Sequence, residues 1–361
     1  MPFNKIIGQH RVKLFFQKAL ERGRISHAYL MVGDRGVGKE ATALELAKAL
    51  FCSNNTSKPC QACSDCLRVA KLSHPDLRFI FPAPTKVTED ERKRILKSIA
   101  TNPYQRKEIW ANPSISIEQI REIRRASAFK SLEDKGRVII IVDAERMTLE
   151  ASNALLKILE EPPQKMYLLL ISSRANLLLP TITSRCQLIK FDPLTVEEIE
   201  KALIERNSVK ANQARLSARL AAGSYRQALE LLDEHLQELR DQALEFFRKS
   251  IQSDFKQIIF VEDFLHSMQQ DSKKIKDILI LLTNWFRDVM VFLKTEGDHT
   301  DRLVNFDQVD VLKKFTNKFP NADLYSAVQE IEKSLELIDR NVQLNLILIV
   351  LLSKLRNYVR R

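Results

Sequence analysis

Residues 28–40 read AYLMVGDRGVGKE, so a short apolar run leads directly into a loop that holds three of the chain's 8 glycines. The stretch that follows, 41–50, consists mostly of good helix formers. A strand, a glycine-rich loop and a helix in this order are the context that a phosphate-binding loop requires. Two further apolar runs, 137–143 and 167–172, are typical of buried parallel strands and flank a helical pattern at 149–161, and a shorter strand is predicted at 188–191. The sequence therefore predicts an α/β core with a parallel sheet covered on both faces.

The glycine loop matches the phosphate-binding motif at every position except the last. Its candidate nucleotide-binding residues are Gly33, Gly36, Gly38 and Lys39. The glycines allow backbone N–H groups to close around phosphates, and the lysine reaches the β- and γ-phosphates. The motif then places a Ser or Thr hydroxyl on Mg²⁺, but here the residue is Glu40, which brings negative charge beside a polyphosphate. The loop indicates a nucleotide-hydrolysing scaffold without competent hydrolysis.

A second departure from a hydrolase follows the apolar run at 137–143. In phosphate-loop ATPases this strand ends in an Asp that helps to hold Mg²⁺, followed directly by an acidic residue that activates water. Here Asp143 is followed by Ala144, and Glu145 lies one position further on. Glu145 either reaches the site or is a surface acid at the start of a helix, and the sequence leaves both interpretations open. The two departures point in the same direction.

The bulk composition bounds the answer without deciding it. The chain has 361 residues, with 57 Lys and Arg against 46 Asp and Glu, a formal net charge of +11. This basic excess fits contact with nucleic acid or acidic partners, and it equally fits a solvated surface. The first residues lack the pattern of a signal peptide, and the longest apolar run, 346–352, is too short to span a bilayer. We expect a soluble, cytoplasmic protein with no membrane partner.

The pattern predicts three domains. Residues 1–192 form the α/β core, 193–232 a small helical domain that opens with a capping box at 195–198, and 233–361 an all-helical domain. Within the core, 82–114 holds four prolines and a charged helical piece. We expect this stretch to be a surface insertion, partly mobile.

Four of the 5 cysteines lie close together, in the spacing C-x7-C-x2-C-x2-C: Cys52, Cys60, Cys63 and Cys66. Paired C-x2-C steps place thiolates on tight turns that converge on a tetrahedral Zn²⁺. Disulfides are the alternative, which a cytoplasmic location disfavours. Four thiolates leave no open coordination position, so we expect a structural zinc and not a catalytic one.

Several motifs together carry a resemblance to a known family. They are 7–9 (IGQ), 27–30 (HAYL), the glycine loop, the four-cysteine insert, 153–163 (NALLKILEEPP) and 184–186 (SRC). This combination resembles the subunits of the bacterial sliding-clamp loader, the AAA+ assembly of DNA polymerase III. Specific motifs carry the match over roughly 1–232, and architecture alone carries it beyond.

The family contains an ATP-hydrolysing motor type and a non-hydrolysing type. In this family the motor type has an intact phosphate loop and an adjacent Asp-Glu pair. Glu40 and Ala144 depart from both features, so they favour the non-hydrolysing type, and the segment 74–77 (HPDL) resembles that type as well. The resemblance implies a stator subunit that assembles with tau/gamma and delta subunits and helps to load the sliding clamp onto primer–template DNA. ATP is then bound by neighbouring subunits, and the degenerate loop of this chain is not expected to hydrolyse it.

The resemblance also assigns roles to single residues. Arg185 matches the arginine finger that projects into the ATP site of the neighbouring subunit. Lys157 lies on the helix that faces the central chamber, which implies contact with DNA phosphates. Arg226 matches a nucleotide-sensing arginine, and with an empty loop its role would be structural. The segment 341–352 should be the buried central helix of a C-terminal collar. A basic cluster on a predicted helix, Arg121, Arg124 and Arg125, fits either DNA contact or a solvated face.

Two other functions remain open at the level of sequence. An active AAA+ ATPase, such as a motor-type loader subunit, predicts ATP turnover by the isolated chain. A zinc-stabilised DNA-binding module predicts tight DNA binding without partners, although no groove-reading motif is present.

Overall fold

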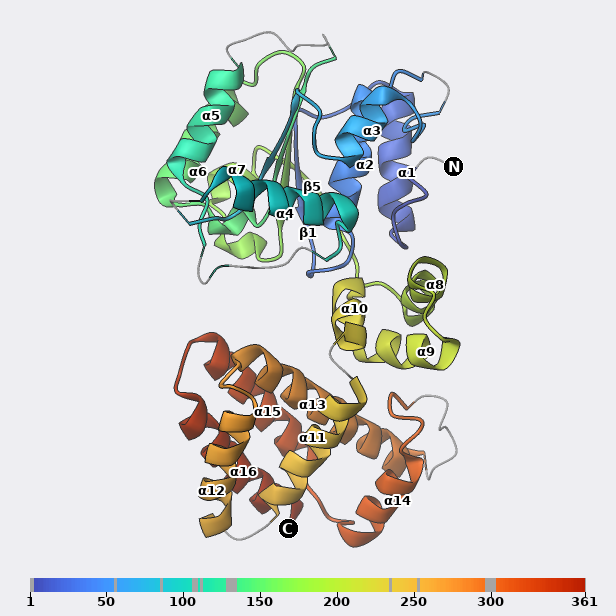
Figure 1. Cartoon of the computed structure of the whole chain (residues 1–361), viewed down its shortest axis with the longest axis vertical. Helices are drawn as coiled ribbons and strands as arrows, with labels where there is room; N and C mark the ends of the chain where they lie inside the picture. Colours follow the sequence, from blue (N-terminus) through green and yellow to red (C-terminus); the bar gives the residue numbers. More distant parts are fainter. Residues whose placement is uncertain are drawn as a thin grey trace. The chain divides into compact units, whose positions relative to one another are not determined.

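A computed structural model of the chain describes residues 3–54, 57–84, 87–105, 110, 113–127, 135–233, 236–251, 254–295 and 303–360. They form two compact units (Figure 1). The first unit comprises 1–214 and 221–229, and the second comprises 215–220 and 230–361. The predicted division into three domains stays a prediction.

The first unit is built on a five-stranded sheet in the order β2-β3-β4-β1-β5, in which every neighbouring pair is parallel. The strands are β1 (Ala28–Val32), β2 (Leu77–Ile80), β3 (Arg137–Ile141), β4 (Met166–Ser172) and β5 (Gln187–Lys190). The strands predicted from the apolar runs are confirmed as β1, β3 and β4, and the strand predicted at 188–191 is confirmed as β5, whereas β2 was not foreseen. Because β1 lies between β4 and β5, the glycine loop leaves the carboxyl edge of the sheet from an interior strand, next to the outer strand β5.

Helices cover both faces of this sheet (Figure 1). They are α1 (His10–Glu21), α2 (Lys39–Phe51), α3 (Ser64–Ala70), α4 (Glu89–Thr101), α5 (Ile117–Ser127), α6 (Leu149–Glu160) and α7 (Pro180–Thr183). Strand residues alternate between two apolar cores: Met31 and Ile140 join the core with α1 and α2, and Leu30 and Ile139 join the core with α5 and α6. Burial on both faces explains why the strands read as continuous apolar runs.

The stretch 82–114 differs from its expectation as a surface insertion. Thr88 and Glu91 form a capping box at the start of α4, yet Ile99 in the same helix is fully buried in the core beside α2. Tyr104, after the helix, is 5% exposed. The expectation is therefore wrong for the second half of α4 and the turn after it, which pack into the first unit.

The short helices that follow the sheet are α8 (Val196–Asn207), α9 (Ala211–Leu220) and α10 (Tyr225–Asp233). Thr195 caps α8 and forms the predicted capping box with Glu198. The last residues of α9 and α10 belong to the second unit.

The second unit is helical throughout its described residues. Its helices are α11 (Leu236–Ser250), α12 (Asp254–Ser267), α13 (Ser272–Lys294), α14 (Val309–Lys318), α15 (Leu324–Asp339) and α16 (Leu344–Val359). In α16, Leu348 and Leu351 are fully buried, whereas Leu346 and Val350 are about half exposed, 55% and 50%. The apolar segment 341–352 thus packs into the core on one side and leaves apolar surface on the other.

The predicted fold class is confirmed in its architecture: an α/β core with a parallel sheet is followed by helical regions. Among the described helices, none is both long and apolar enough to cross a membrane.

Candidate functional site

The glycine loop lies between β1 and α2, as the sequence predicted. Gly38 caps the amino end of α2 with a φ of 105°, which side chains disfavour. An added Cβ at Gly36 would collide with Ser224 and Arg226, at the start of α10. The loop therefore has the backbone geometry of its motif, but residues of the same unit lie directly against it.

Lys39 is turned back onto its own loop. Its side chain is 6% exposed, and its Nζ donates hydrogen bonds to the carbonyl oxygens of Gly33 and Asp34. Burial lowers the pKa of Lys39 to about 8, although the nearby Glu40 and Asp143 oppose that shift. The cation that would reach the β- and γ-phosphates is thus bonded to backbone oxygens of the loop.

The cavity at the loop is very small. It measures about 30 Å³. Its lining residues are Arg35, Gly36, Gly38, Lys39, Glu40, Pro103, Tyr104, Asp143, Ile171 and Arg226. A single water occupies about 30 Å³ of liquid, whereas ligand pockets measure roughly 300–1,000 Å³. In this conformation the loop does not accommodate a nucleotide.

The acidic residues after β3 are held inside the unit. Asp143 is 5% exposed, and Ala144 is fully buried. Glu145 starts a short helical turn, as one interpretation expected, but it is not a fully exposed surface acid. Its Oε1 accepts hydrogen bonds from the backbone N–H and the hydroxyl of Ser173, at 3.2 and 2.8 Å. Ser173 follows β4, so this contact joins the carboxyl ends of two neighbouring strands.

The four predicted cysteines come together. The Sγ atoms of Cys52, Cys60, Cys63 and Cys66 all lie within 4.8 Å of one another. Cys52 ends α2, and Cys63 caps α3, where its Sγ accepts a hydrogen bond from the N–H of Cys66. A convergent set of four thiols, with backbone N–H groups directed at sulfur, fits a tetrahedral metal site.

Asp65 fastens this cysteine cluster to the core. Its carboxylate is 3% exposed and accepts hydrogen bonds from Lys135 and Arg68, at 2.5 Å each, and from the hydroxyl of Ser53 at 2.8 Å. These donors outweigh the effect of burial and hold the pKa of Asp65 well below its usual range. Since Lys135 immediately precedes β3, the network ties the insert to the sheet.

Arg185 lies away from the glycine loop. Gln187 in β5 pairs with Tyr29, so Arg185, two residues earlier, lies at the amino edge of the sheet, opposite the edge from which the loop leaves. Its Nη2 is 2.9 Å from Oε1 of Glu160, and its Nη1 donates to the carbonyl of Thr181 at 3.0 Å. The side chain is 37% exposed. Arg185 therefore cannot complete the loop of its own chain and is available to another molecule.

A family model described as "DNA polymerase III, delta subunit" matches residues 8–195 of the chain. The DNA polymerase III subunit delta' of Bacillus subtilis (strain 168) is 30% identical over 312 residues, which are 85% of this chain and 83% of that protein. The chain belongs to the delta' family of DNA polymerase III subunits.

This delta' family member is also similar to other DNA polymerase III subunits and to a solved structure. The DNA polymerase III subunit tau of Escherichia coli (strain K12) is 32% identical over 238 residues, 64% of this chain but only 32% of that protein. Among solved structures, a DNA polymerase III gamma subunit-related protein from Thermotoga maritima aligns over 96% of this chain and 99% of its own, with a TM-score of 0.45 and 17% identity.

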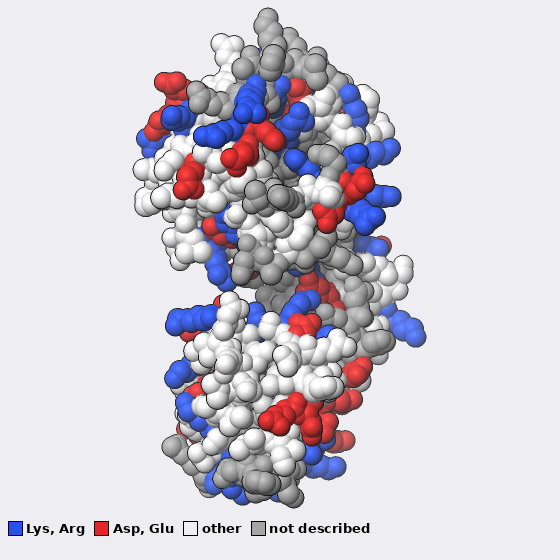
Figure 2. All heavy atoms as spheres, turned by 60° about the vertical axis from the view of Figure 1, so that its left-hand side comes forward, with Lys and Arg blue, Asp and Glu red and all other residues white. Residues whose placement is uncertain are grey.

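The basic residues assigned to DNA are exposed. Lys157 on α6 and Arg121 and Arg125 on α5 are exposed, and α5 packs against α6. The side chain of Arg124 lies outside the described residues. On the face in Figure 2, which brings this side of the first unit forward, basic and acidic side chains are interspersed. The arrangement leaves the choice between DNA contact and a solvated face where the sequence left it.

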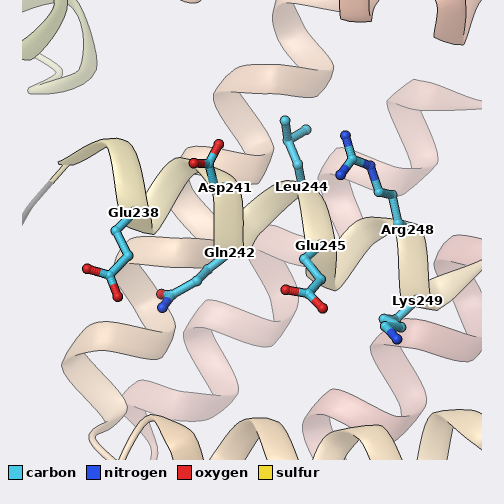
Figure 3. Close-up of a pocket in the computed structure, with 7 residues that line it drawn as sticks. All are labelled: Glu238, Asp241, Gln242, Leu244, Glu245, Arg248 and Lys249. Atoms are coloured by element: carbon cyan, nitrogen blue, oxygen red, sulfur yellow. The ribbon is translucent and has the colours of Figure 1, made fainter.

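The second unit of this delta' family member has a hollow of about 630 Å³ along α11. Its lining residues are Glu238, Asp241, Gln242, Leu244, Glu245, Arg248 and Lys249 (Figure 3). All come from one helix, with acids toward its amino end and bases toward its carboxyl end, an order that stabilises the helix dipole. We interpret this hollow as open helix surface and not as a reactive site.

Sequence reasoning missed Tyr104, Ser173 and Asp65. Tyr104 lies in a stretch without periodicity, and its partners are far away in the chain. Ser173 carried a weak signal, because it follows directly on a predicted strand whose neighbour ends in Asp143. Asp65 lies between two predicted metal ligands, which makes it a candidate for orienting the insert.

Proposed function

We propose that this chain is the non-hydrolysing stator subunit of the DNA polymerase III clamp loader, acting in the cytoplasm, and that Arg185 serves as an arginine finger for the ATP site of a neighbouring tau/gamma subunit. The observation that carries the proposal is the contrast between two cationic side chains that lie at opposite edges of the same sheet. Lys39 is enclosed by its own loop, whereas Arg185 lies at the opposite edge with 37% of its side chain exposed.

The chemistry of a guanidinium explains why one residue is sufficient for this role. Charge develops on the transferred phosphoryl group in the transition state, and a preorganised cation beside it lowers the barrier. Arginine fingers are worth roughly 10³–10⁵ in rate where they have been measured. Glu160 and the Thr181 carbonyl hold Arg185 at two of its nitrogens and leave the rest of the fork open. A chain without hydrolysis of its own can thus complete a neighbour's site.

The remaining parts of the proposal concern metal, partners and DNA. We infer that the four-cysteine cluster binds one structural Zn²⁺, because its thiols converge and no reactive group lies among them. The second unit would provide the collar contacts with the tau/gamma and delta subunits, for which the exposed Leu346 and Val350 are suited. Lys157 would contact phosphates of primer–template DNA, with a salt-dependent contribution to affinity.

The test is the ATPase rate of a loader reconstituted with this chain, its motor and delta subunits, the sliding clamp and primed DNA. The resemblance implies about three motor subunits in one loader, so with Arg185→Ala we expect the rate to fall by about a third if the motor sites act independently, and nearly to zero if they are coupled. Arg185→Lys should not restore it, because an ammonium lacks the planar fork. Arg22→Ala, an exposed arginine after α1, is the charge-matched control. An unchanged rate with intact assembly would refute the finger.

The alternative of an active ATPase has the backbone geometry of the loop in its favour, but the side chains at the loop oppose it. It requires the loop to open, Lys39 to leave two carbonyl partners, and Glu40 to hold Mg²⁺ in place of a hydroxyl. ATP turnover by the isolated chain, abolished by Lys39→Ala, would establish it.

A further inference from the structure

Tyr104 has an unusual position for a residue of an expected surface insertion. Its side chain is 5% exposed, and its hydroxyl accepts a hydrogen bond from the backbone N–H of Ile7 at 2.9 Å. The two residues are 97 positions apart in the chain. The turn after α4 is therefore fastened to the segment that precedes α1.

The ring of Tyr104 also lies against the glycine loop. A Cβ added to Gly38 would be 3.1 Å from its hydroxyl oxygen and 3.3 Å from the ring, so the loop backbone approaches the tyrosine closely. On another side the ring meets Tyr225 at the start of α10, edge to face, with centroids 5.2 Å apart. One side chain thus contacts the N-terminal segment, the phosphate loop and the helix beyond β5.

Tyr104 lines two cavities of very different size. One is the cavity of about 30 Å³ at the loop, and the other is a cavity of about 680 Å³ beside α2. The second cavity has apolar walls from Ala41 and Leu44, and it is also lined by Arg206 and by Lys48, which pairs with Glu45 at 2.6 Å. Its volume is within the range of small-molecule sites, roughly 300–1,000 Å³.

Neither cavity alone is suited to a nucleoside triphosphate. The cavity at the loop has the backbone N–H groups for phosphates but space for about one water, while the larger cavity has space for a base and a sugar but no phosphate loop. Both are lined by Tyr104 and its neighbour Pro103. Tyr104 lies directly against Gly38, so its side chain is one obstacle to a ligand at the loop, beside the contacts of Ser224 and Arg226 with Gly36.

We propose that Tyr104 closes a latent nucleoside-triphosphate site formed by the glycine loop and the adjacent larger cavity, and that shortening this residue lets the chain bind a nucleoside triphosphate. This inference rests on the proposed function, in which the chain does not hydrolyse ATP, and it adds a reason why the glycine loop is closed to ATP. On binding, Lys39 would exchange the carbonyls of Gly33 and Asp34 for phosphate oxygens. Turnover should not follow, because Glu40 and Ala144 remain in place.

The experiment is a titration of the full-length chain with a fluorescent ATP analogue and Mg²⁺, with unlabelled ATP as competitor. We expect no saturable binding by the unchanged chain up to millimolar ligand, and at least about 30-fold tighter binding by Tyr104→Ala. Tyr104→Phe, which keeps the ring and loses only the hydroxyl, is the matched control and should remain closed. Lys39→Ala in the Tyr104→Ala background should abolish the new binding, because it removes the phosphate-binding cation.

Two outcomes would overturn the proposal that Tyr104 closes the site: a folded Tyr104→Ala chain that still does not bind the ATP analogue, or an unchanged chain that binds it as tightly as the variant. If the alanine variant does not fold, Tyr104→Leu keeps apolar carbons next to the backbone but removes the ring and the hydroxyl that lie against Gly38, so it answers the same question. A second measurement uses the unchanged chain alone. Its amide hydrogen exchange at 33–40 should be the same with and without about 5 mM Mg·ATP, a concentration that would protect the loop even if binding were weak. Protection of the loop by ATP would contradict the proposal.

The experiments distinguish a failure of the proposal about Tyr104, here called the plug, from a failure of the proposed stator role. The stator role is read from Arg185→Ala in the assembled loader, which does not involve Tyr104. ATP binding by Tyr104→Ala together with an unchanged rate in Arg185→Ala would support the plug and refute the finger. No binding by folded Tyr104→Ala together with a lowered rate in Arg185→Ala would refute the plug alone.

Discussion

The phosphate loop and Arg185 lie at opposite edges of one parallel sheet, and each edge presents a cation. At the carboxyl edge, Lys39 is 6% exposed and donates to two carbonyls of its own loop, so its ammonium group is hydrogen-bonded inside the chain. At the amino edge, Arg185 is 37% exposed and pairs with Glu160, itself 49% exposed. An exposed pair of this kind is worth roughly 0–1 kcal/mol, so its guanidinium can be transferred to a phosphate at little cost.

This difference shows that the two edges of the sheet hold their cations in different ways. The inward site is filled by residues of the same unit, which stabilise the core and need no ligand. The outward residue is held only loosely, by one carboxylate and one carbonyl. This contrast between an enclosed Lys39 and a partly exposed Arg185 is what the proposed role of Arg185 at a neighbour's site rests on.

Deleting each cation separately should give the largest contrast. In the reconstituted loader we expect Arg185→Ala to lower the clamp- and DNA-stimulated ATPase rate by about a third to nearly all of it, and Lys39→Ala to change it by less than about twofold. The reason is that only Arg185 would touch a reacting phosphate. Steady-state ATPase assays on size-checked complexes measure both. A Lys39→Ala loader as slow as Arg185→Ala would mean that the inward loop also acts in catalysis.

Loss of the proposed zinc should have the largest effect on stability, and it should act on the part of the first unit that holds the phosphate loop. Cys52 ends α2, the helix that starts at Lys39, so the cysteine cluster fixes the far end of the phosphate-loop helix. We expect Cys63→Ser to lose bound zinc and to lower the free energy of unfolding by several kcal/mol, on the order of 3 or more. Metal analysis and thermal melts followed by circular dichroism measure this.

The matched control for the zinc prediction is Cys186→Ser. Burial raises the pKa of the Cys186 thiol to about 11, and this cysteine lies outside the cluster, so it should stay protonated and bind no metal. Its variant should keep the full zinc content. A Cys63→Ser chain with unchanged zinc and unchanged melting would show that the cluster is not a metal site.

The enclosure of Lys39 should also be visible as a pH effect. Its pKa is about 8 in the folded chain and 10.5 ordinarily, so between these values the unfolded chain binds more protons than the folded one. The free energy of unfolding therefore gains a contribution that rises with pH across this window. Below about pH 8 the buried charge costs stability, at most about 3 kcal/mol.

The measurement compares urea unfolding of Lys39→Met with the unchanged chain at about pH 7.5 and pH 10. The variant should be relatively more stable at the lower pH, and its advantage should shrink by about 1–3 kcal/mol at the higher one. Other titrating groups cancel in this difference. An advantage that does not change with pH would mean that Lys39 is not desolvated, and the contrast with Arg185 would lose its electrostatic basis.

Local patterns predicted much of this arrangement and failed where contacts are remote. Apolar runs buried on both faces gave β1, β3 and β4, and the spacing of four cysteines gave their convergence. β2 has only four residues, and the exposed Arg78 interrupts its apolar run, so no continuous pattern stands out. The contact of Tyr104 with Ile7 joins residues 97 positions apart, and no periodicity encodes a contact of that kind.

The site residues divide in the same way. Lys39 was placed correctly by its motif, but its bonds to its own loop depend on the backbone path and on what packs against it. Glu145 was left between two interpretations, because only the folded sheet brings Ser173 beside it. The exposed edge that presents Arg185 follows from strand order, which the sequence does not contain in any local form.

The smallest expected effect concerns the partner of the outward arginine. Glu160→Gln removes the charge that faces Arg185 across 2.9 Å but leaves the Thr181 carbonyl, which accepts from Nη1 at 3.0 Å. Because both side chains of the pair are exposed, we expect the free energy of unfolding to change by less than about 0.5 kcal/mol. The loader's ATPase rate should change by less than about threefold, since the finger is still held at one nitrogen. A fall as large as that of Arg185→Ala would show that Glu160 orients the guanidinium, and the outward site would then be as preorganised as the inward one.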